Sequence, residues 1–208
     1  MKAGTFTLLA AALWITPVFA STYTVTVDTS SLTNPTSGFI DFGFNGGFPA
    51  TAAISNFALT GGALHGSSIT TQGTIAGALP GTVTISQDTA DYDEGLTFGS
   101  SVSFTLDLTG TPSGSVGDVF TFSFFNPNFT GGLLTGNNND FWLAQFQMDT
   151  QGNITSTAFA NPAGGPSFAT IQAVSVGAPE PGTWALVGLG VLGAWLRRRM
   201  CPRPRLEE

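Results

Sequence analysis

The sequence predicts an all-β fold, a single jelly-roll-like sandwich of about eight to ten strands within residues 21–176. Three observations predict it. Apolar and polar residues alternate along several segments, the apolar positions are rich in Phe, Val and Ile, and clusters of Gly, Pro and Asn separate the segments. No part of this region shows the period of about 3.6 residues that marks an amphipathic helix. An N-terminal signal peptide and a C-terminal transmembrane helix are expected to flank the domain.

Each expected strand is a run in which every second residue is apolar and the intervening residues are mostly Thr, Ser, Asp or Gly. Because side chains of a strand alternate between its two faces, these apolar residues would share one face and pack into the core. In chain order they are Tyr23, Val25 and Val27; Ile40, Phe42 and Phe44; Val83 and Ile85; Val102, Phe104, Leu106 and Leu108; Phe120, Phe122 and Phe124; and Trp142, Ala144, Phe146 and Met148.

The later part of the domain predicts turns and two short strands. Residues 137–140 (NNND) have the composition of a polar loop tip, and residues 149–153 (DTQGN) that of a turn. A strand is expected over residues 154–159. Residues 161–166 (NPAGGP) then separate it from a final short strand over residues 168–176.

Residues 1–20 have the layout of a secretory signal peptide. Lys2 supplies the positive n-region, residues 6–15 form the apolar stretch, and Ala20 is the small residue at which signal peptidase cleaves. A retained membrane anchor or a buried helix is the alternative, but the apolar stretch is short and is followed by Pro17, which breaks helices. Signal peptidase is therefore expected to cleave directly after Ala20.

Residues 182–199 predict a transmembrane anchor. The apolar run spans residues 182–196, or roughly 22 Å as a helix against a hydrocarbon core of about 30 Å, so its length alone permits either a membrane span or a buried core helix. Trp184 and Trp195 lie near its two ends, where interfacial aromatic rings prefer to lie. The run is followed at once by Arg197, Arg198 and Arg199. These neighbours favour insertion into a membrane.

Basic residues occur only near the two ends of the chain. The six are Lys2, Arg197, Arg198, Arg199, Arg203 and Arg205, whereas residues 21–176 contain ten acidic residues and no Lys or Arg. Because positively charged flanks stay on the cytoplasmic side, residues 21–176 are expected to be exported and residues 200–208 to form a cytoplasmic tail. The uniformly negative domain excludes nucleic acid as a partner.

A linker of residues 177–181 contains Pro179, Glu180 and Pro181. This motif, followed by the apolar helix and the Arg cluster close to the chain end, resembles the PEP-CTERM sorting signal. The resemblance implies a substrate of an exosortase, with Pro179-Glu180-Pro181 as the recognition motif. It also implies that the helix holds the chain in the inner membrane as a sorting anchor and that the Arg cluster stops transfer.

The same resemblance implies a destination and a setting. After processing, the exported domain would reach the cell surface or the extracellular matrix. Substrates of this kind are commonly linked to exopolysaccharide and biofilm production, so exopolysaccharide is an expected partner. We expect a non-catalytic surface or matrix protein.

Four acidic residues crowd one segment of the domain: Asp88, Asp91, Asp93 and Glu94. Such carboxylates repel each other unless they are solvated or bridged by a hard cation. The segment lacks the Gly and the terminal Glu of an EF-hand loop. We expect a solvated acidic turn, with a Ca²⁺ site as the alternative; no other cofactor is expected.

Asp140 beside Trp142 forms the one pairing of a carboxylate with a large aromatic residue that suggests a ligand site. A Ca²⁺-aided, lectin-like carbohydrate-binding module is therefore the alternative to a purely structural role. An exported hydrolase would need paired carboxylates across a sugar. His65, the single histidine, lies in a Gly- and Ser-rich stretch expected to be a loop, without a nucleophile motif. No catalytic residue is predicted.

Overall fold

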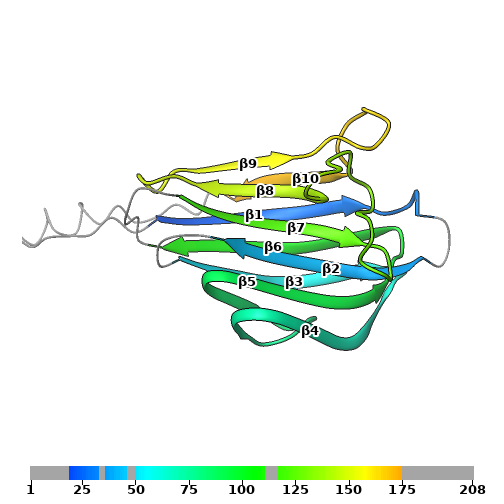
Figure 1. Ribbon diagram of the computed structural model, residues 1–208, viewed down its shortest axis with the longest axis horizontal. Coiled ribbons are helices and arrows are strands. Elements are labelled where there is room, and N and C mark those ends of the chain that lie inside the picture. Colours follow the sequence, from blue (N-terminus) through cyan, green and yellow to red (C-terminus); the bar gives the residue numbers. More distant parts are fainter. Residues whose placement is uncertain (1–18, 33–35, 46–49, 111–116, 175–208) are drawn as a thin grey trace, which may run out of the picture. The chain divides into compact units, whose positions relative to one another are not determined.

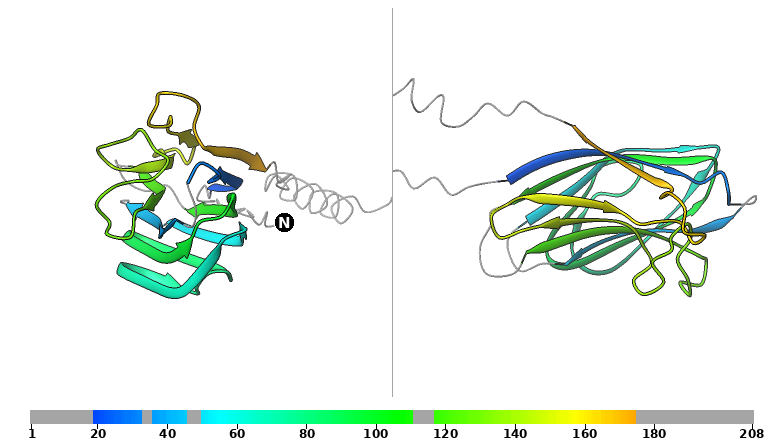
Figure 2. Two further views of the ribbon diagram at one scale, coloured as in Figure 1. Left: turned by 90° about the vertical axis from the view of Figure 1, so that its right-hand side faces the viewer. Right: turned by 90° about the horizontal axis from the view of Figure 1, so that it is seen from above.

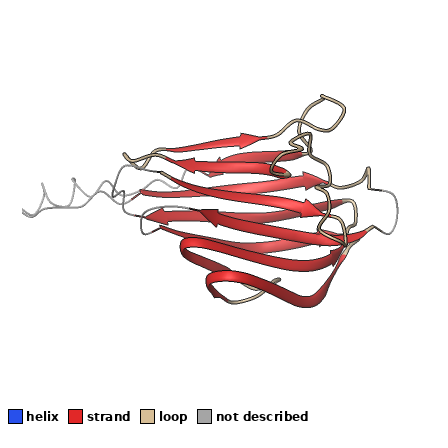
Figure 3. Ribbon diagram, viewed as in Figure 1, coloured by secondary structure: helices blue, strands red, loops and turns tan. Residues whose placement is uncertain are grey.

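The computed structural model describes residues 19–32, 36–45, 50–110 and 117–174. These residues form ten strands and no helix, so the predicted all-β class is confirmed (Figures 1 and 3). In chain order the strands are β1 (Phe19–Asp28), β2 (Ser37–Asn45), β3 (Ala50–Thr60), β4 (Ala63–Ala76), β5 (Val83–Thr97), β6 (Ser101–Gly110), β7 (Asp118–Phe125), β8 (Trp142–Met148), β9 (Ile154–Ala158) and β10 (Ala169–Val174).

The predicted signal peptide, sorting motif and anchor lie almost entirely outside the described residues. The exception is the end of the signal peptide, because Phe19 and Ala20 begin β1 and pair with Gly110 and Thr109 of β6. Cleavage after Ala20 would leave β1 to begin at Ser21. Within the described ranges, no helix is long and apolar enough to cross a membrane.

All ten strands join one antiparallel sheet. Its order is β10-β1-β6-β3-β5-β2-β7-β8-β9, and β4 pairs with β5 outside this path. The sheet folds over on itself, so that β2, β7, β8 and β9 form one layer over β3, β6, β1 and β10, and β9 approaches β10 at the open side (Figures 1 and 2). The prediction of a sandwich is corrected in this respect: its two layers are parts of one nearly closed sheet.

The long strand β5 makes the two layers continuous. Its residues 83–86 pair with β3 in one layer, and its residues 89–97 pair with β2 in the other. Strand β4 pairs along the opposite edge of β5 through both parts. Because one strand changes partner along its length, the hydrogen-bond ladder passes from layer to layer instead of stopping at two separate edges.

Phenylalanine dominates the core between the layers. Phe42 of β2 and Phe122 of β7 both meet Phe104 of β6 edge-on, at centroid separations of 5.2 and 5.3 Å. Tyr23 of β1 packs on Phe146 of β8 at 4.9 Å. All five rings are buried, and edge-to-face contacts add to the gain from removing them from water. These contacts hold the two layers together.

The alternation predicts the buried residues correctly with one exception. Every residue assigned above to the core is buried except Trp142, which is partly exposed. The register shows the cause: Ala144 is opposite Phe122 and Trp142 is opposite Ser123, so Leu143 is an extra residue in β8. This bulge buries Leu143 and turns Trp142 to the outer face.

Two strands occur where the alternation did not predict them, β3 and β4. His65, expected in a loop, lies in β4 and its Nε2 is 2.9 Å from Oγ1 of Thr97. Strand β4 lacks a regular alternation of apolar and polar residues. Its pairing with β5 shifts register three times, and Gly66 and Gly73 adopt positive φ.

Candidate functional site

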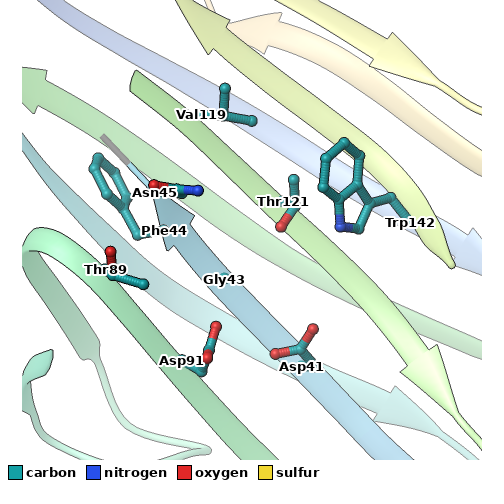
Figure 4. A pocket seen from close by; sticks show the side chains of 9 residues that line it. All are labelled: Asp41, Gly43, Phe44, Asn45, Thr89, Asp91, Val119, Thr121 and Trp142. Atoms are coloured by element: carbon teal, nitrogen blue, oxygen red, sulfur yellow. The ribbon is translucent and has the colours of Figure 1, made fainter. Parts of the chain in front are cut away.

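A pocket of about 270 Å³ opens on the outer face of the layer that contains β2 and β7 (Figure 4). Residues from β2, β5, β7 and the start of β8 form it. They are Asp41, Gly43, Phe44, Asn45, Thr89, Asp91, Val119, Thr121 and Trp142. Polar groups and two aromatic residues, the partly exposed Trp142 and the buried Phe44, therefore meet at a surface that the alternation predicts only to be polar.

Strand pairing brings these side chains together, since residues opposite each other on neighbouring strands project to the same face. Strand β2 lies in the middle, between β5 and β7. In the strand register, Asp41 of β2 is opposite Asp93 of β5 and Ser123 of β7. Gly43 of β2 is opposite Asp91 of β5 and Thr121 of β7. Asp41, Asp91 and Asp93 consequently belong to one outer-face group, which we term the acidic group.

Gly43 keeps the centre of the pocket open. A Cβ atom built at this position would lie 2.9 Å from Oγ1 of Thr121 and 3.4 Å from Oδ1 of Asp91. Any side chain here would therefore occupy the space between the hydroxyl and the carboxylate. Figure 4 shows Gly43 between the two side chains, with Asp41 further along the same strand.

Burial and mutual repulsion perturb two members of the acidic group. Burial, followed by the negative charges of Asp93 and Asp91, raises the pKa of Asp41 from 3.8 to about 8. Burial and then the charge of Asp91 raise the pKa of Asp93 to about 6. At neutral pH the Asp41 carboxyl is therefore mostly protonated and can donate a hydrogen bond, as well as accept one.

Ser123 lies between two residues of the pocket and is fully buried. It is opposite Asp41 on β2 and opposite Trp142 on β8, so its side chain is on the same face as theirs. Its Oγ atom has no hydrogen-bond partner. A buried hydroxyl without a partner costs about 1–3 kcal/mol, but Ser123 does not line the pocket, so a ligand in the pocket would not reach it.

An aromatic cluster continues the outer face beyond the pocket. Phe39 and Phe125 are opposite each other, two residues beyond Asp41 and Ser123 along their strands. The ring of Phe129 lies 4.3 Å from that of Phe39 and 5.5 Å from that of Phe125. Phe129 is 41% exposed although it is a large apolar residue.

The loop between β7 and β8 holds part of this cluster in an unusual backbone conformation. Phe129 and Phe141 have φ values of 54° and 62°, in the left-handed region that bulky residues rarely adopt. The Asn126 side chain supports the turn by accepting hydrogen bonds from the backbone N–H groups of Asn128 and Thr130. Such local strain is typical of binding loops held in place by their surroundings.

The predicted acidic turn is wrong. Asp88, Asp91, Asp93 and Glu94 all lie in β5, so neighbouring members project to opposite faces. Asp91 and Asp93 face outward into the acidic group, while the side chain of Asp88 is outside the described residues. Only 5% of Asp93 and 2% of Glu94 are exposed, so these two are not solvated.

Glu94 faces the interior and takes part in a separate network. Its Oε2 accepts a hydrogen bond of 2.9 Å from the Tyr92 hydroxyl, which in turn accepts one of 3.0 Å from the backbone N–H of Leu79. The second oxygen, Oε1, has no partner. Because Glu94 is on the opposite face from Asp91 and Asp93, these residues do not converge on one ion. In the described part of the chain, no three His, Cys, Asp or Glu side chains are grouped to hold a metal ion.

The predicted pair of Asp140 and Trp142 separates in the structure. Trp142 lines the pocket, whereas Asp140 is exposed in the loop before β8 and is not a lining residue. Sequence reasoning missed Asp41, Gly43 and Thr121. The period of two predicts that these three residues face outward. It does not predict which strands pair with each other, and therefore it does not predict that these residues meet.

Comparison with known proteins identifies one segment. The family described as the PEP-CTERM protein-sorting motif matches residues 178–199, which include Pro179, Glu180 and Pro181 and the Arg cluster. This match confirms the predicted PEP-CTERM sorting signal and supports an exported protein that an exosortase sorts. No curated protein and no solved structure matched the chain.

Proposed function

We propose that this chain is an exosortase-sorted surface or matrix protein whose β domain binds extracellular polysaccharide, without catalysis, in the pocket between Asp41 and Trp142. Signal peptidase and exosortase process its two ends, and the inner membrane holds it through residues 182–199 until then. The sorting motif at residues 178–199 supports the proposed export and processing of the chain. The pocket supports the role of the exported domain.

One observation carries the binding proposal: an open pocket in which an aromatic ring stands beside hydroxyl, amide and carboxyl groups. Sugars present an apolar ring face and a rim of hydroxyls, and sites of this composition match both. Thr121, Asn45 and the carboxyl of Asp41 can donate hydrogen bonds, and each can also accept them. The exposed ring of Phe129, beyond the pocket on the same face, offers a second apolar surface for a longer chain.

The non-catalytic part of the proposal has to be tested against the carboxyl groups of the pocket. Glycoside hydrolysis needs two carboxyl groups that both reach the scissile bond. Asp41 and Asp91 both line the pocket, whereas Asp93 is 5% exposed and does not. His65 is the single described histidine, and it is bonded to Thr97 and not to a carboxylate of the pocket.

Retention of the full chain on immobilised exopolysaccharide, with a glycan array to identify the sugar, tests this proposal. Trp142→Ala should reduce retention by about tenfold or more, the loss expected when one stacking aromatic side chain is removed. Asp140→Asn is the matched control and should bind as the wild-type chain does. Selective binding that survives Trp142→Ala, or no binding to any glycan, would overturn the proposal.

The Ca²⁺-aided alternative and the hydrolase alternative are tested in the same samples. Binding should be unchanged by a chelator, and the melting temperature should be unchanged by added Ca²⁺, because the carboxylates of β5 are divided between two faces. Incubation with the bound polysaccharide should release no shorter products.

A further inference from the structure

We infer that the polysaccharide is held over several sugar units, because a second sugar site lies beyond Trp142 in a hollow between two loops. This inference rests on the proposed function and extends it. The hollow, which we term the loop pocket, has a volume of about 400 Å³ and is lined by residues of the loop before β8 and of the loop after β9. The ligand is then an internal, uncharged stretch of a polysaccharide chain that crosses Trp142.

One pair of aromatic rings connects the loop pocket with the pocket between Asp41 and Trp142. The ring of Phe159 lines the loop pocket and lies 6.4 Å from the ring of Trp142, which lines the other pocket. The backbone N–H of Phe159 donates a hydrogen bond of 3.0 Å to the carbonyl of Leu143, which fixes this residue beside β8. A sugar chain that stacks on Trp142 can therefore continue onto Phe159.

The order of the strands sets the direction of the bound chain. Asp91, Gly43, Thr121 and Trp142 lie on β5, β2, β7 and β8, which are successive strands of the sheet. Phe159 directly follows β9, the next strand. Neighbouring strands are about 4.8 Å apart, so the chain would advance by roughly 10 Å from β2 to β8 before it reaches the loop pocket. It would run across the strands.

The two loops that form the loop pocket touch through their backbones at the same end of the sheet (Figure 1). The N–H of Gly136 donates a hydrogen bond of 2.8 Å to the carbonyl of Ala160. A Cβ atom built at Gly136 would lie 2.8 Å from the carbonyl oxygen of Asn161, so any other residue would force the loops apart. The hydroxyl of Thr135 also donates a hydrogen bond of 2.6 Å to the carbonyl of Trp142, which ties the first loop to β8.

The side chain of Asn161 holds the second loop in shape. Its Oδ1 accepts hydrogen bonds from the N–H groups of Ala163 and Gly165, at 2.8 and 3.0 Å. Its Nδ2 donates one of 3.0 Å to the carbonyl of Pro166. Both walls of the loop pocket are thus fixed without a ligand, and binding needs little ordering of the loops.

The groups that line the loop pocket suit an uncharged sugar. Phe159 and Pro162 supply apolar surface for a sugar ring, and every lining residue is uncharged. The hydrogen bonds of the Asn137 side chain use its Oδ1, which accepts from the N–H groups of Asn139 and Asp140. The two N–H groups of the same amide can then donate to sugar hydroxyls.

Calorimetric titration of the full chain with oligosaccharides of two and six units tests the inference. The probes are neutral oligosaccharides of glucose, galactose and mannose. A six-unit chain offers five registers to a two-unit site, so a single site predicts a ratio of affinities of about fivefold. The ratio for the wild-type chain should exceed this by about tenfold, the gain expected of one further ring contact with its hydrogen bonds. A wild-type ratio of about fivefold or less would overturn the inference.

Variants separate this inference from the proposed function. Ala160→Gln fills the loop pocket from an exposed position and should return the ratio to about fivefold, with the affinity for two units unchanged. Ala163→Gln, in the same loop but not a lining residue, is the matched control and should keep the wild-type ratio.

Phe159→Ala removes the ring without filling the loop pocket and should also lower the ratio, whereas Trp142→Ala should weaken the binding of both lengths. A ratio unchanged in both Ala160→Gln and Phe159→Ala would overturn the second site and leave the proposed function intact. No binding of any oligosaccharide to the wild-type chain would overturn both.

Discussion

The wild-type protein should lose stability as the pH rises from 5 to 8, and replacing Asp41 by Asn should remove most of this loss. In the folded protein, burial and the charges of Asp93 and Asp91 raise the pKa of Asp41 to about 8, whereas an unfolded chain would return it to about 3.8. Between these values the folded state binds more protons than the unfolded state. The free energy of unfolding must therefore fall as the pH rises through this window.

The size of the effect follows from the same values. Each pKa unit is worth about 1.36 kcal/mol, so a pKa raised from 3.8 to about 8 sets an upper limit of roughly 6 kcal/mol for Asp41 alone, of which about 4 kcal/mol falls between pH 5 and pH 8. The side chain is only partly buried, and water at the pocket mouth stabilises the charged form. A loss of about 2 kcal/mol is the expected result, which for a domain of this size lowers the melting temperature by about 4–8 °C.

Thermal unfolding followed by circular dichroism at pH 5, 6, 7 and 8 measures this loss. Asp41→Asn keeps the shape of the carboxyl group but cannot ionise, so its melting temperature should change much less over the same range. Asp140→Asn removes an exposed carboxylate and should unfold with the wild-type pH dependence. A wild-type melting temperature that is constant or rises from pH 5 to pH 8 would refute the burial of Asp41, as would an Asn variant with the same loss.

Two other carboxylates have the opposite effect in a different range of pH. Hydrogen bonds from Ser30 lower the pKa of Asp28, and hydrogen bonds from Asn153 and its neighbours lower that of Asp149. Both therefore stabilise the folded state above their ordinary pKa, and this contribution disappears as the pH falls through the lowered values. Maximal stability is expected near pH 4, at the upper end of the range of these two groups and at the lower end of that of Asp41.

Three further predictions concern the core, the pocket and the sorting signal. Phe122→Ala should lower the free energy of unfolding by about 3–5 kcal/mol in urea titrations, because it leaves a cavity between the layers; a loss below 1 kcal/mol would contradict the packing described. Gly43→Ala should weaken polysaccharide binding and also lower the melting temperature, since the added methyl group lies 2.9 Å from Oγ1 of the buried Thr121 and forces that side chain to shift; binding equal to wild type would exclude this position from the site. Changing Pro179 and Pro181 to Ala should leave the C-terminal segment attached when the mature protein is analysed by mass spectrometry, while an unaltered cleavage product would exclude these prolines from recognition.

The core could be predicted from the sequence because a period of two is a local property. Val102 to Leu108 and Phe120 to Phe124 each place their apolar residues on one face whatever strands lie beside them, and all are buried. The pattern fails where the strand itself is irregular. One extra residue, Leu143, reverses the faces at the start of β8 and moves Trp142 from the expected core to the pocket.

The candidate site could not be predicted because it depends on which strands become neighbours. Asp41 and Asp91 lie on strands that are separated along the chain by β3 and β4, and only the pairing of β2 with β5 brings them together. The crowded sequence Asp88 to Glu94 predicted a cluster of four carboxylates. In a strand, however, alternate residues diverge, so Glu94 enters the interior and only part of the cluster remains.

The absence of basic residues from residues 21–176 links the predicted route of the domain to the chemistry of its pocket. Positive charge resists transfer across the membrane, so a body without Lys or Arg suits export, and the Arg residues stay beside the sorting motif. The same absence means that no Lys or Arg of residues 21–176 offsets the burial of Asp41 beside Asp93 and Asp91. That burial and those two charges raise the pKa of Asp41, so the composition that suits export also favours a protonated carboxyl group in the pocket.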